Sequence, residues 1–242
     1  MALDVRPSPI AGKWYQGNPK ALRRMVYEFL DQAQLPELYG EVIAVVAPHA
    51  GHIYSGSVAG YAFAALRGRT PDLVAVIAPM HHPYFEPLLT TAHEAYTTPL
   101  GDIPVDRDAL HALDGFLKSE LGIGLTPVSR DPEHSLEIEL PFLQCALASQ
   151  WKLLPVMVRA REPVVSQGLG KALAQVLSGR NFVLVASTDL SHFYEQQTAL
   201  VYDRSMLNAI ESFDPERAFD LERAEKGFAC GLGAVTAVLW AA

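Results

Sequence analysis

Three stretches of this sequence, VIAVVAPHAGH (42–52), LVAVIAPMHH (73–82) and FVLVASTDLSH (182–192), each run from consecutive apolar residues into a loop that carries a histidine. A continuous apolar run bounded by turn residues is typical of a β-strand buried on both faces. Such strands form parallel sheets covered by helices, and ligands bind at the carboxyl ends of these strands. We therefore predict an α/β fold in which the three histidine-bearing loops contribute to one polar site.

The segments around these strands predict the remaining elements. Asn18-Pro19 indicates a helix start, with asparagine as the N-cap and proline at the first helical position. GSVAGYAFAALRG (56–68) predicts a small-residue helix between strands 42–47 and 73–78, which completes a parallel strand–helix–strand unit. The further predicted elements are a hairpin over 91–106, helices over 107–119, 163–178 and 199–211, a charged, solvated helix over 214–226, a short strand near 125–128 and a closing apolar helix after the glycine-rich GFACGLG.

Two prolines modify these predictions. Pro141 lies within EHSLEIELPFLQCALA (133–148), which predicts a helix that is broken or kinked near the proline, because proline has no backbone N–H. Pro155 lies in KLLPVMV (152–158), a fourth apolar strand, and predicts that this strand forms an edge or a bulge.

The composition narrows the class of protein. Half of the 242 residues are apolar and 19% are charged, so the chain can bury a core and is not disordered. The net charge of −8 argues against a nucleic-acid-binding surface, which is normally basic. No run of 18 apolar residues predicts a membrane span, and MALDVRPSPIAGK lacks the apolar region of a signal peptide. Two cysteines make no disulfide framework, which favours a cytoplasmic protein. From the charge and the lack of a long apolar run we expect neither nucleic-acid nor membrane partners.

His49 and His81 follow two of the predicted strands in similar contexts, APHAGH and APMHH. A lone histidine in such a loop most often bonds a nearby carbonyl. Two histidines at neighbouring strand ends instead favour a metal site, because imidazole is the commonest metal ligand. His82 is the weaker candidate of its pair, since consecutive residues in extended chain point apart.

The third strand ends at Asp189 and His192. A carboxylate close to an imidazole can orient the ring, or the two can act as an acid–base pair. The alternative is that Asp189 only caps the following turn.

Cys230 lies where a glycine turn enters the last predicted helix. Helix N-termini lower the pKa of a thiol, so a metal-binding thiolate is one interpretation and a buried, inert cysteine is the other. Cys145 lies among apolar residues of a predicted helix, and we assign it to the core.

Three further residues are candidates for contacts around the site. His134 and Glu137 are three residues apart, so that one helix face would direct both into the same cleft, as neighbours of the site rather than as ligands. Tyr54, beside the His49 loop, could offer its hydroxyl, although aromatic residues in such loops more often pack. His93 and His111 are assigned no role.

Six motifs that occur in order along the chain resemble those of the Memo-like family. They are APHAGHIYSG, APMHH, TTPLGDIPVD, EHSLEIELPFL, STDLSH and FACG, and the opening VRPSPIAGKWY belongs with them. The resemblance covers nearly the whole chain. It implies one α/β domain over 1–242, folded as a three-layer α/β/α sandwich around a mostly parallel mixed sheet, as in class III extradiol dioxygenases.

The resemblance also implies the chemistry of the site. It places His49, His81 and Cys230 at a transition metal, with Asp189 and His192 lining the same pocket. Iron(II) is the expected metal, with copper or zinc as alternatives, because two histidines and a thiolate form a softer set than two histidines and a carboxylate. The family is further linked to recognition of phosphotyrosine peptides and to a radical-SAM partner protein.

From these observations we expect a metal-dependent redox enzyme that acts on a small molecule or peptide, with His192 as acid/base group and Asp189 orienting it. One alternative is a non-enzymatic module that uses the pocket to bind an anionic peptide or to handle metal, although the acidic charge and the scarcity of pocket arginines count against it. Another is a zinc hydrolase. Family members usually continue through a further strand beyond the position of Ala242, so we also expect an exposed sheet edge.

Overall fold

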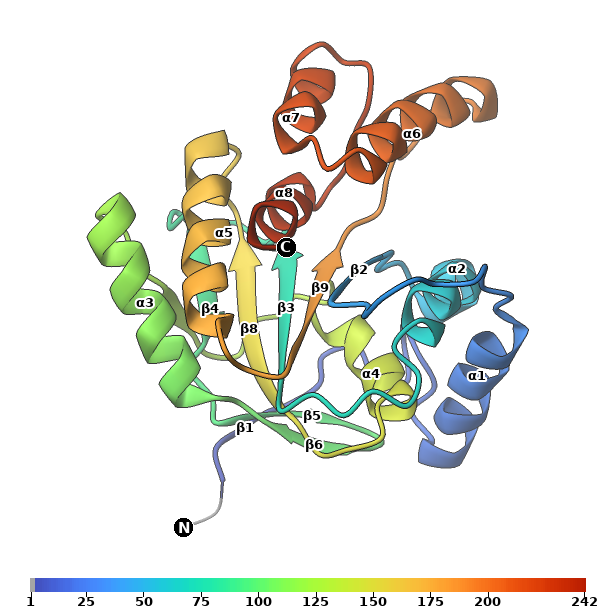
Figure 1. The fold of residues 1–242 in the computed structure, drawn as a ribbon. Coiled ribbons are helices and arrows are strands. Elements are labelled where there is room, and N and C mark those ends of the chain that lie inside the picture. Colours follow the sequence, from blue (N-terminus) through green and yellow to red (C-terminus); the bar gives the residue numbers. More distant parts are fainter. Residues whose placement is uncertain (1–2) are drawn as a thin grey trace.

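A computed structural model describes residues 3–242, and its centre is a six-stranded sheet (Figure 1). The strand order is β2-β9-β3-β8-β4-β7. The four strands β2, β9, β3 and β8 are parallel, whereas β4 runs antiparallel to β8 and parallel to β7. Their bounds are β2 (Ala44–Ala47), β3 (Leu73–Pro79), β4 (Leu88–Thr91), β7 (Thr126–Val128), β8 (Lys152–Val158) and β9 (Phe182–Ser187).

The three predicted histidine-bearing strands are β2, β3 and β9, and β9 lies between the other two. All seven residues of β3 are buried, as expected for a strand covered on both faces. The prediction that Pro155 marks an edge or a bulge is wrong, because β8 pairs with β3 without interruption and with β4 on its other side. Pairing with β4 covers only Leu88–Val158 and Leu89–Met157, so the strand tolerates the missing N–H of Pro155 beyond that point.

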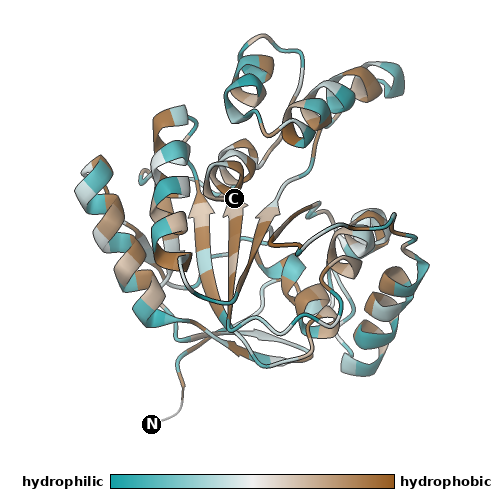
Figure 2. Ribbon diagram, in the orientation of Figure 1, coloured by the Kyte–Doolittle hydropathy of each residue, from teal (hydrophilic) through white to brown (hydrophobic). Residues whose placement is uncertain are grey.

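Helices cover both faces of this sheet, which confirms the predicted α/β sandwich. Helices α3 (Arg107–Leu121), α5 (Pro163–Leu177) and α8 (Leu232–Ala241) pack together on one face, and α1 (Pro19–Gln32), α2 (His52–Ala64) and α4 (Leu140–Ala146) form the other group. In Figure 2 the strands are mostly hydrophobic and the outer sides of the helices are hydrophilic. Glycine allows a close contact between α1 and α2: a Cβ on Gly60 would lie 2.6 Å from the carbonyl oxygen of Phe29.

A second, three-stranded sheet lies below the main one. The predicted hairpin is present as β5 (Ala95–Thr98) and β6 (Gly101–Pro104), and β1 (Val5–Arg6) pairs in parallel with β5. This pairing brings the start of the chain under the loop that begins at Asp131, where the Arg6 guanidinium is almost completely buried.

The 133–148 segment differs from the predicted kinked helix. Residues before Ser135 are irregular, Glu137–Glu139 form a 3₁₀ turn, and α4 begins only at Leu140. Pro141 therefore lies in the first turn of α4, where its missing N–H costs no intrahelical hydrogen bond.

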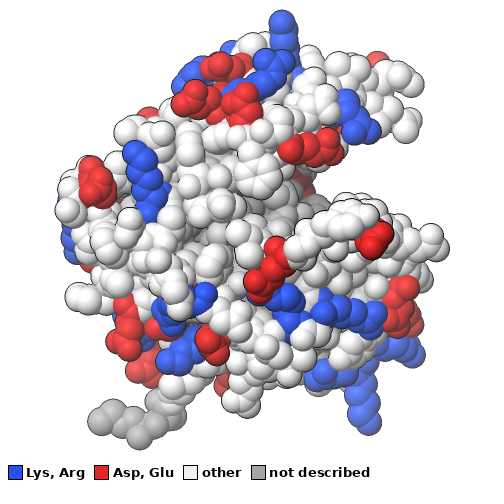
Figure 3. All heavy atoms as spheres, in the orientation of Figure 1, with Lys and Arg blue, Asp and Glu red and all other residues white. Residues whose placement is uncertain are grey.

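Helices α6 (Gln196–Glu211) and α7 (Pro215–Arg223) form an arm beyond the carboxyl ends of the parallel strands in Figure 1, with α7 packed against α8. The expectation of a solvated helix over 214–226 is only partly correct, because α7 buries Ala218, Phe219 and Leu221 in a small apolar cluster with α6 and α8. Within residues 3–242 no helix has the length and apolar character needed to cross a bilayer. In Figure 3 the surface is hollowed between this arm and the N-terminal helices.

Candidate metal centre

The carboxyl ends of three parallel strands bring the predicted site residues together. His49 follows β2, His81 follows β3, and Asp189 and His192 follow β9 between them. Because β9 separates β2 from β3, His49 and His81 are not on adjacent strands, yet their ring centroids lie 5.2 Å apart. The loops therefore converge on one site, as the sequence predicted.

His49, His81 and His134 each place one ring nitrogen so that all three atoms lie within 4.8 Å of one another. Three imidazole nitrogens at this separation suit a single transition-metal ion, because metal–nitrogen bonds of about 2 Å would span it. The sequence pattern favoured a position for His134 beside the site and not among the ligands. The structure gives this side chain a ligand's position as well.

A serine hydroxyl binds one of the two ring nitrogens of His49. Its Nδ1 hydrogen-bonds the Ser187 Oγ at 2.8 Å, and that hydroxyl lies 2.8 Å from Oε1 of the fully buried Glu139. This contact leaves Nε2 as the free ligand atom of His49. Burial, and then the charges of His81 and His134, hold the pKa of His49 well below its usual value, which keeps the ring neutral as a metal ligand requires.

Glu139 itself is an unusual feature of this site. Burial raises the pKa of its carboxyl well above the usual value, and its Oε2 is a buried atom with no hydrogen-bond partner within residues 3–242. Burial therefore favours the neutral form of this carboxyl, which avoids the cost of a buried, unpaired charge.

His81 is held by a carboxylate in place of a hydroxyl. Its Nδ1 lies 2.9 Å from Oε1 of Glu133, and its backbone N–H donates to Oε2 at 2.6 Å. Hydrogen bonding to Cys230 and then to Glu133 raises the pKa of His81 to about 10, so without metal this ring is protonated at neutral pH. Burial alone would raise the pKa of Glu133, but the hydrogen bonds from His81 and Ser135 outweigh burial and lower it.

His134 stacks between two rings. Its centroid lies 4.0 Å from that of Trp14 and 4.9 Å from that of His81. Burial lowers the pKa of His134, with the His81 charge acting in the same direction. The stacking on Trp14 therefore holds the third ring of the histidine cluster in place.

Cys230 enters the site from the turn before α8. Its Sγ lies 3.1 Å from Nε2 of His49 and accepts from the backbone N–H of Asp189 at 3.1 Å. A Cβ on the next residue, Gly231, would overlap the carbonyl oxygen of Ser187, so glycine allows the turn to approach the end of β9. The other cysteine, Cys145, is buried in the main core as expected.

Asp189 connects His49 and His192. Its Oδ1 accepts from the backbone N–H of His49 at 2.9 Å, and its Oδ2 lies 3.8 Å from Nε2 of His192. The His192 side chain is about half exposed, at 48%, and lines the adjoining pocket. The pair can thus orient and exchange a proton with a molecule in that pocket.

Two predicted site residues lie elsewhere. Glu137 is fully buried, and its carboxylate bonds Arg6, Ser8 and Tyr15 away from the histidines, because the 3₁₀ turn replaces the predicted helix face. Tyr54 is 79% exposed on α2 and has no hydrogen bond through its hydroxyl to any of residues 3–242.

Four residues of the site were missed from the sequence: Trp14, Glu133, Ser187 and Glu139. One signal was available for Glu139, because a carboxylate within the apolar run LEIELPFL needs a buried partner. Ser187 ends the third histidine-bearing strand, where strand ends already marked the site. Nothing in the local pattern distinguishes Glu133 from an acidic loop residue.

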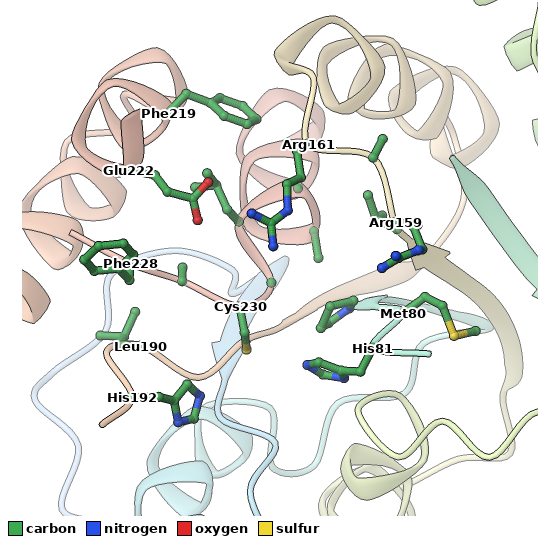
Figure 4. Close-up of a pocket in the computed structure, with 18 of the residues that line it drawn as sticks. Met80, His81, Arg159, Arg161, Leu190, His192, Phe219, Glu222, Phe228 and Cys230 are labelled. Carbon is green, nitrogen blue, oxygen red and sulfur yellow. The ribbon is translucent and has the colours of Figure 1, made fainter. Parts of the chain in front are cut away.

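A pocket of about 720 Å³ opens beside the histidines (Figure 4). His81, His192 and Cys230 lie at one end of it, as Figure 4 shows. The walls come from the loops after β3 and β8, from the arm and from the start of α8. A molecule in this pocket would contact His81 and Cys230 from one side.

The fold and site define a class: an α/β sandwich with a histidine-rich centre at the carboxyl edge of its parallel strands. A family model described as Memo-like protein matches residues 6–242, and the chain belongs to this family.

Proteins named as MEMO1 family proteins are similar to the chain over most of its length. The one from Methanococcoides burtonii is 34% identical over 240 residues, covering 98% of this chain and 87% of the relative. The one from Thermotoga neapolitana is 33% identical, covering 97% and 87%. The one from Nitrosopumilus maritimus is 30% identical, covering 97% and 86%.

Proposed function

We propose that this protein binds one transition-metal ion through His49 and His81 and uses it in a redox reaction on a small molecule held in the adjoining pocket. One observation supports this most strongly: Ser187 and Glu133 occupy Nδ1 of the two rings. Each histidine therefore keeps its Nε2 for a ligand bond. Partners of this kind orient metal-binding histidines in metalloproteins.

We propose Cys230 as the third ligand, since its Sγ lies 3.1 Å from Nε2 of His49. Two donor atoms at that distance can share one ion at about 2.0 and 2.3 Å. His134 is the alternative third donor, because its ring nitrogen belongs to the triad. Nitrogen and thiolate donors together suit iron(II), copper or zinc, and we propose iron(II).

A bound iron ion with an open position would supply electron transfer and a binding point for small ligands. The surrounding side chains do the rest. His192, exposed to the pocket and 3.8 Å from Asp189, holds a proton at Nε2 or Nδ1 close to the bound molecule. Trp14 and the buried Glu139 restrict the movement of His134 and His49, so the donor set is arranged before the metal binds.

Metal analysis of protein purified without added metal tests this proposal. We expect about one ion per wild-type chain and a large loss in the His49→Ala/His81→Ala double variant. The exposed His111→Ala serves as the matched control. Equal metal content in the wild type and the double variant would overturn the proposal.

Single variants and spectroscopy decide the finer points. Loss of metal in Cys230→Ala but not in His134→Ala supports the thiolate as third ligand, and the reverse result assigns that role to His134. Anaerobic iron loading followed by electron paramagnetic resonance tests the redox assignment. A site that takes only zinc, which is spectroscopically silent, would favour a hydrolase and contradict it.

A further inference from the structure

The pocket has a second polar end, opposite the metal site. Arg159 and Arg161, from the loop after β8, line it together with Glu222 of α7. In Figure 4 the Arg161 and Glu222 side chains both project into the pocket on the far side of Cys230 from His192. The expected scarcity of arginine around the site is therefore wrong for this end of the pocket.

Of the arginines that line the pocket, Arg161 is the one whose guanidinium lacks a partner within residues 3–242. Arg159 donates from Nε to the Tyr84 carbonyl at 3.0 Å, and Arg223 pairs with Asp220 at 3.0 Å. Within the described residues, Arg161 is hydrogen-bonded only through its backbone N–H, which donates to Oε2 of Glu162 at 3.1 Å. Its planar guanidinium, with five donors, is the group best suited to bind a carboxylate through two hydrogen bonds.

Glu222 limits the charge that this end of the pocket can accept. Its side chain is half-buried, and burial raises the pKa of its carboxyl while the charge of Arg161 acts in the opposite direction. One carboxylate beside the free guanidinium offsets part of the positive charge. The pair therefore favours a singly charged ligand group over a doubly charged phosphate.

Apolar side chains line part of the space between the two polar ends. In Figure 4, Phe228 and Leu190 lie between Glu222 and His192, and Phe228 stacks on Tyr194 with a centroid distance of 5.3 Å. A volume of about 720 Å³ is within the range of small-molecule sites.

We propose that the pocket binds an aromatic or aliphatic monocarboxylic acid, with its carboxylate on Arg161 and its apolar body along Phe228 and Leu190. The opposite end of the molecule then lies at His81 and His192. This inference names the substrate class of the proposed redox function and rests on that function for the chemistry at the metal.

Calorimetric titration with a series of probes tests the carboxylate site. The probes are 3-phenylpropionate, 4-phenylbutyrate and 5-phenylvalerate, each compared with its uncharged amide, on metal-free and iron-loaded protein. We expect at least one acid to bind about tenfold more tightly than its amide, the effect of one hydrogen-bonded charge pair. Arg161→Leu should remove this preference, and Arg161→Lys should retain part of it.

The matched control is Arg67→Leu, which removes an equal charge from an exposed pair with Asp31. We expect it to keep the wild-type preference. Equal binding of every acid and its amide by the wild type, or an unchanged preference in Arg161→Leu, would overturn the proposal. Tighter binding of phenyl phosphate than of any acid would overturn the carboxylate assignment.

The two proposals can fail separately. A normal metal content with no preference for acids contradicts only the substrate class. A preference for acids in a protein that binds no metal through His49 and His81 contradicts only the redox function.

Discussion

Glu133 holds His81 at two atoms: Oε2 accepts the backbone N–H at 2.6 Å, and Oε1 lies 2.9 Å from Nδ1 of the ring. The carboxylate also accepts the backbone N–H groups of His134 and Ser135. One buried side chain therefore sets the position of two of the three clustered histidines, because it joins the loop after β3 to the loop before the 3₁₀ turn.

Glu133→Gln is expected to lower metal affinity by about 10- to 100-fold, the range found when the partner of a metal-binding histidine is altered. The amide keeps the size of the side chain but removes the charge and turns one acceptor into a donor. Competition with a chromogenic chelator measures the change.

Glu28→Gln is the control, because Glu28 is exposed on α1 and forms an ion pair with Arg24. Its affinity should equal that of the wild type. If Glu133→Gln bound metal as tightly as the control, the carboxylate would have no role in arranging His81.

The buried Arg6 is expected to be a stability determinant. Its guanidinium bonds Asp131 at 2.7 Å and Glu137 at 2.5 Å and lies over the Tyr96 ring. Arg6→Leu would leave two buried carboxylates without their cation, and we expect a loss of about 3–5 kcal/mol in the free energy of unfolding. Urea denaturation measures this loss.

The exposed Arg67 provides the comparison, since its pair with Asp31 is largely solvated. Arg67→Leu should cost about 1 kcal/mol or less. A similarly small cost for Arg6→Leu would mean that the Arg6 cluster does not anchor the start of the chain.

The sheet and the principal histidines were predictable because their signals are local. Apolar runs of six or seven residues identified β3, β8 and β9, and the residue that follows a strand at the carboxyl edge lies near the ligand site in any parallel sheet. These rules placed His49 and His81 together without any knowledge of the strand order.

The partners of those histidines were not predictable in this way. Glu133 lies 52 residues from His81, and Arg6 lies 131 residues from Glu137, so no spacing in the sequence connects them. The 3₁₀ turn at Glu137–Glu139 also replaces the helix expected from local spacing. Glu137 therefore bonds Arg6, and His134 joins the cluster with His49 and His81. Such contacts depend on tertiary packing alone.

Metal binding is expected to release at least one proton per ion near pH 7–8, because a protonated His81 must lose its proton to coordinate, and a Cys230 thiol that coordinates would release another. Its pKa is raised to about 10 by Cys230 and Glu133, so the ring carries the proton throughout this range without metal. Affinity should therefore increase with pH until the pH reaches about 10. Titration calorimetry in buffers of different ionisation enthalpy counts the protons, and binding without proton release would contradict a charged His81.

The pH dependence of stability should contain a contribution from His52. This ring is buried against Phe142, its Nε2 bonds the Ile138 carbonyl at 3.2 Å, and burial lowers its pKa from 6.5 to about 4. Below pH 6.5 His52 is protonated in the unfolded chain but stays neutral in the folded protein until the pH approaches 4. The contribution of His52 to the free energy of unfolding is therefore fully present above pH 6.5 and is lost as the pH falls toward 4. From these two pKa values we expect a loss of roughly 2 kcal/mol between pH 8 and pH 5.

Comparison of His52→Phe with the wild type isolates this contribution, because phenylalanine keeps an aromatic ring beside Phe142 but cannot titrate. Urea denaturation at the two pH values should show the wild type losing roughly 2 kcal/mol more than the variant. His111→Gln, at an exposed position of α3, should follow the wild-type profile. Parallel profiles for the wild type and His52→Phe would contradict this expectation. They would mean that His52 has the same pKa in the folded protein as in the unfolded chain.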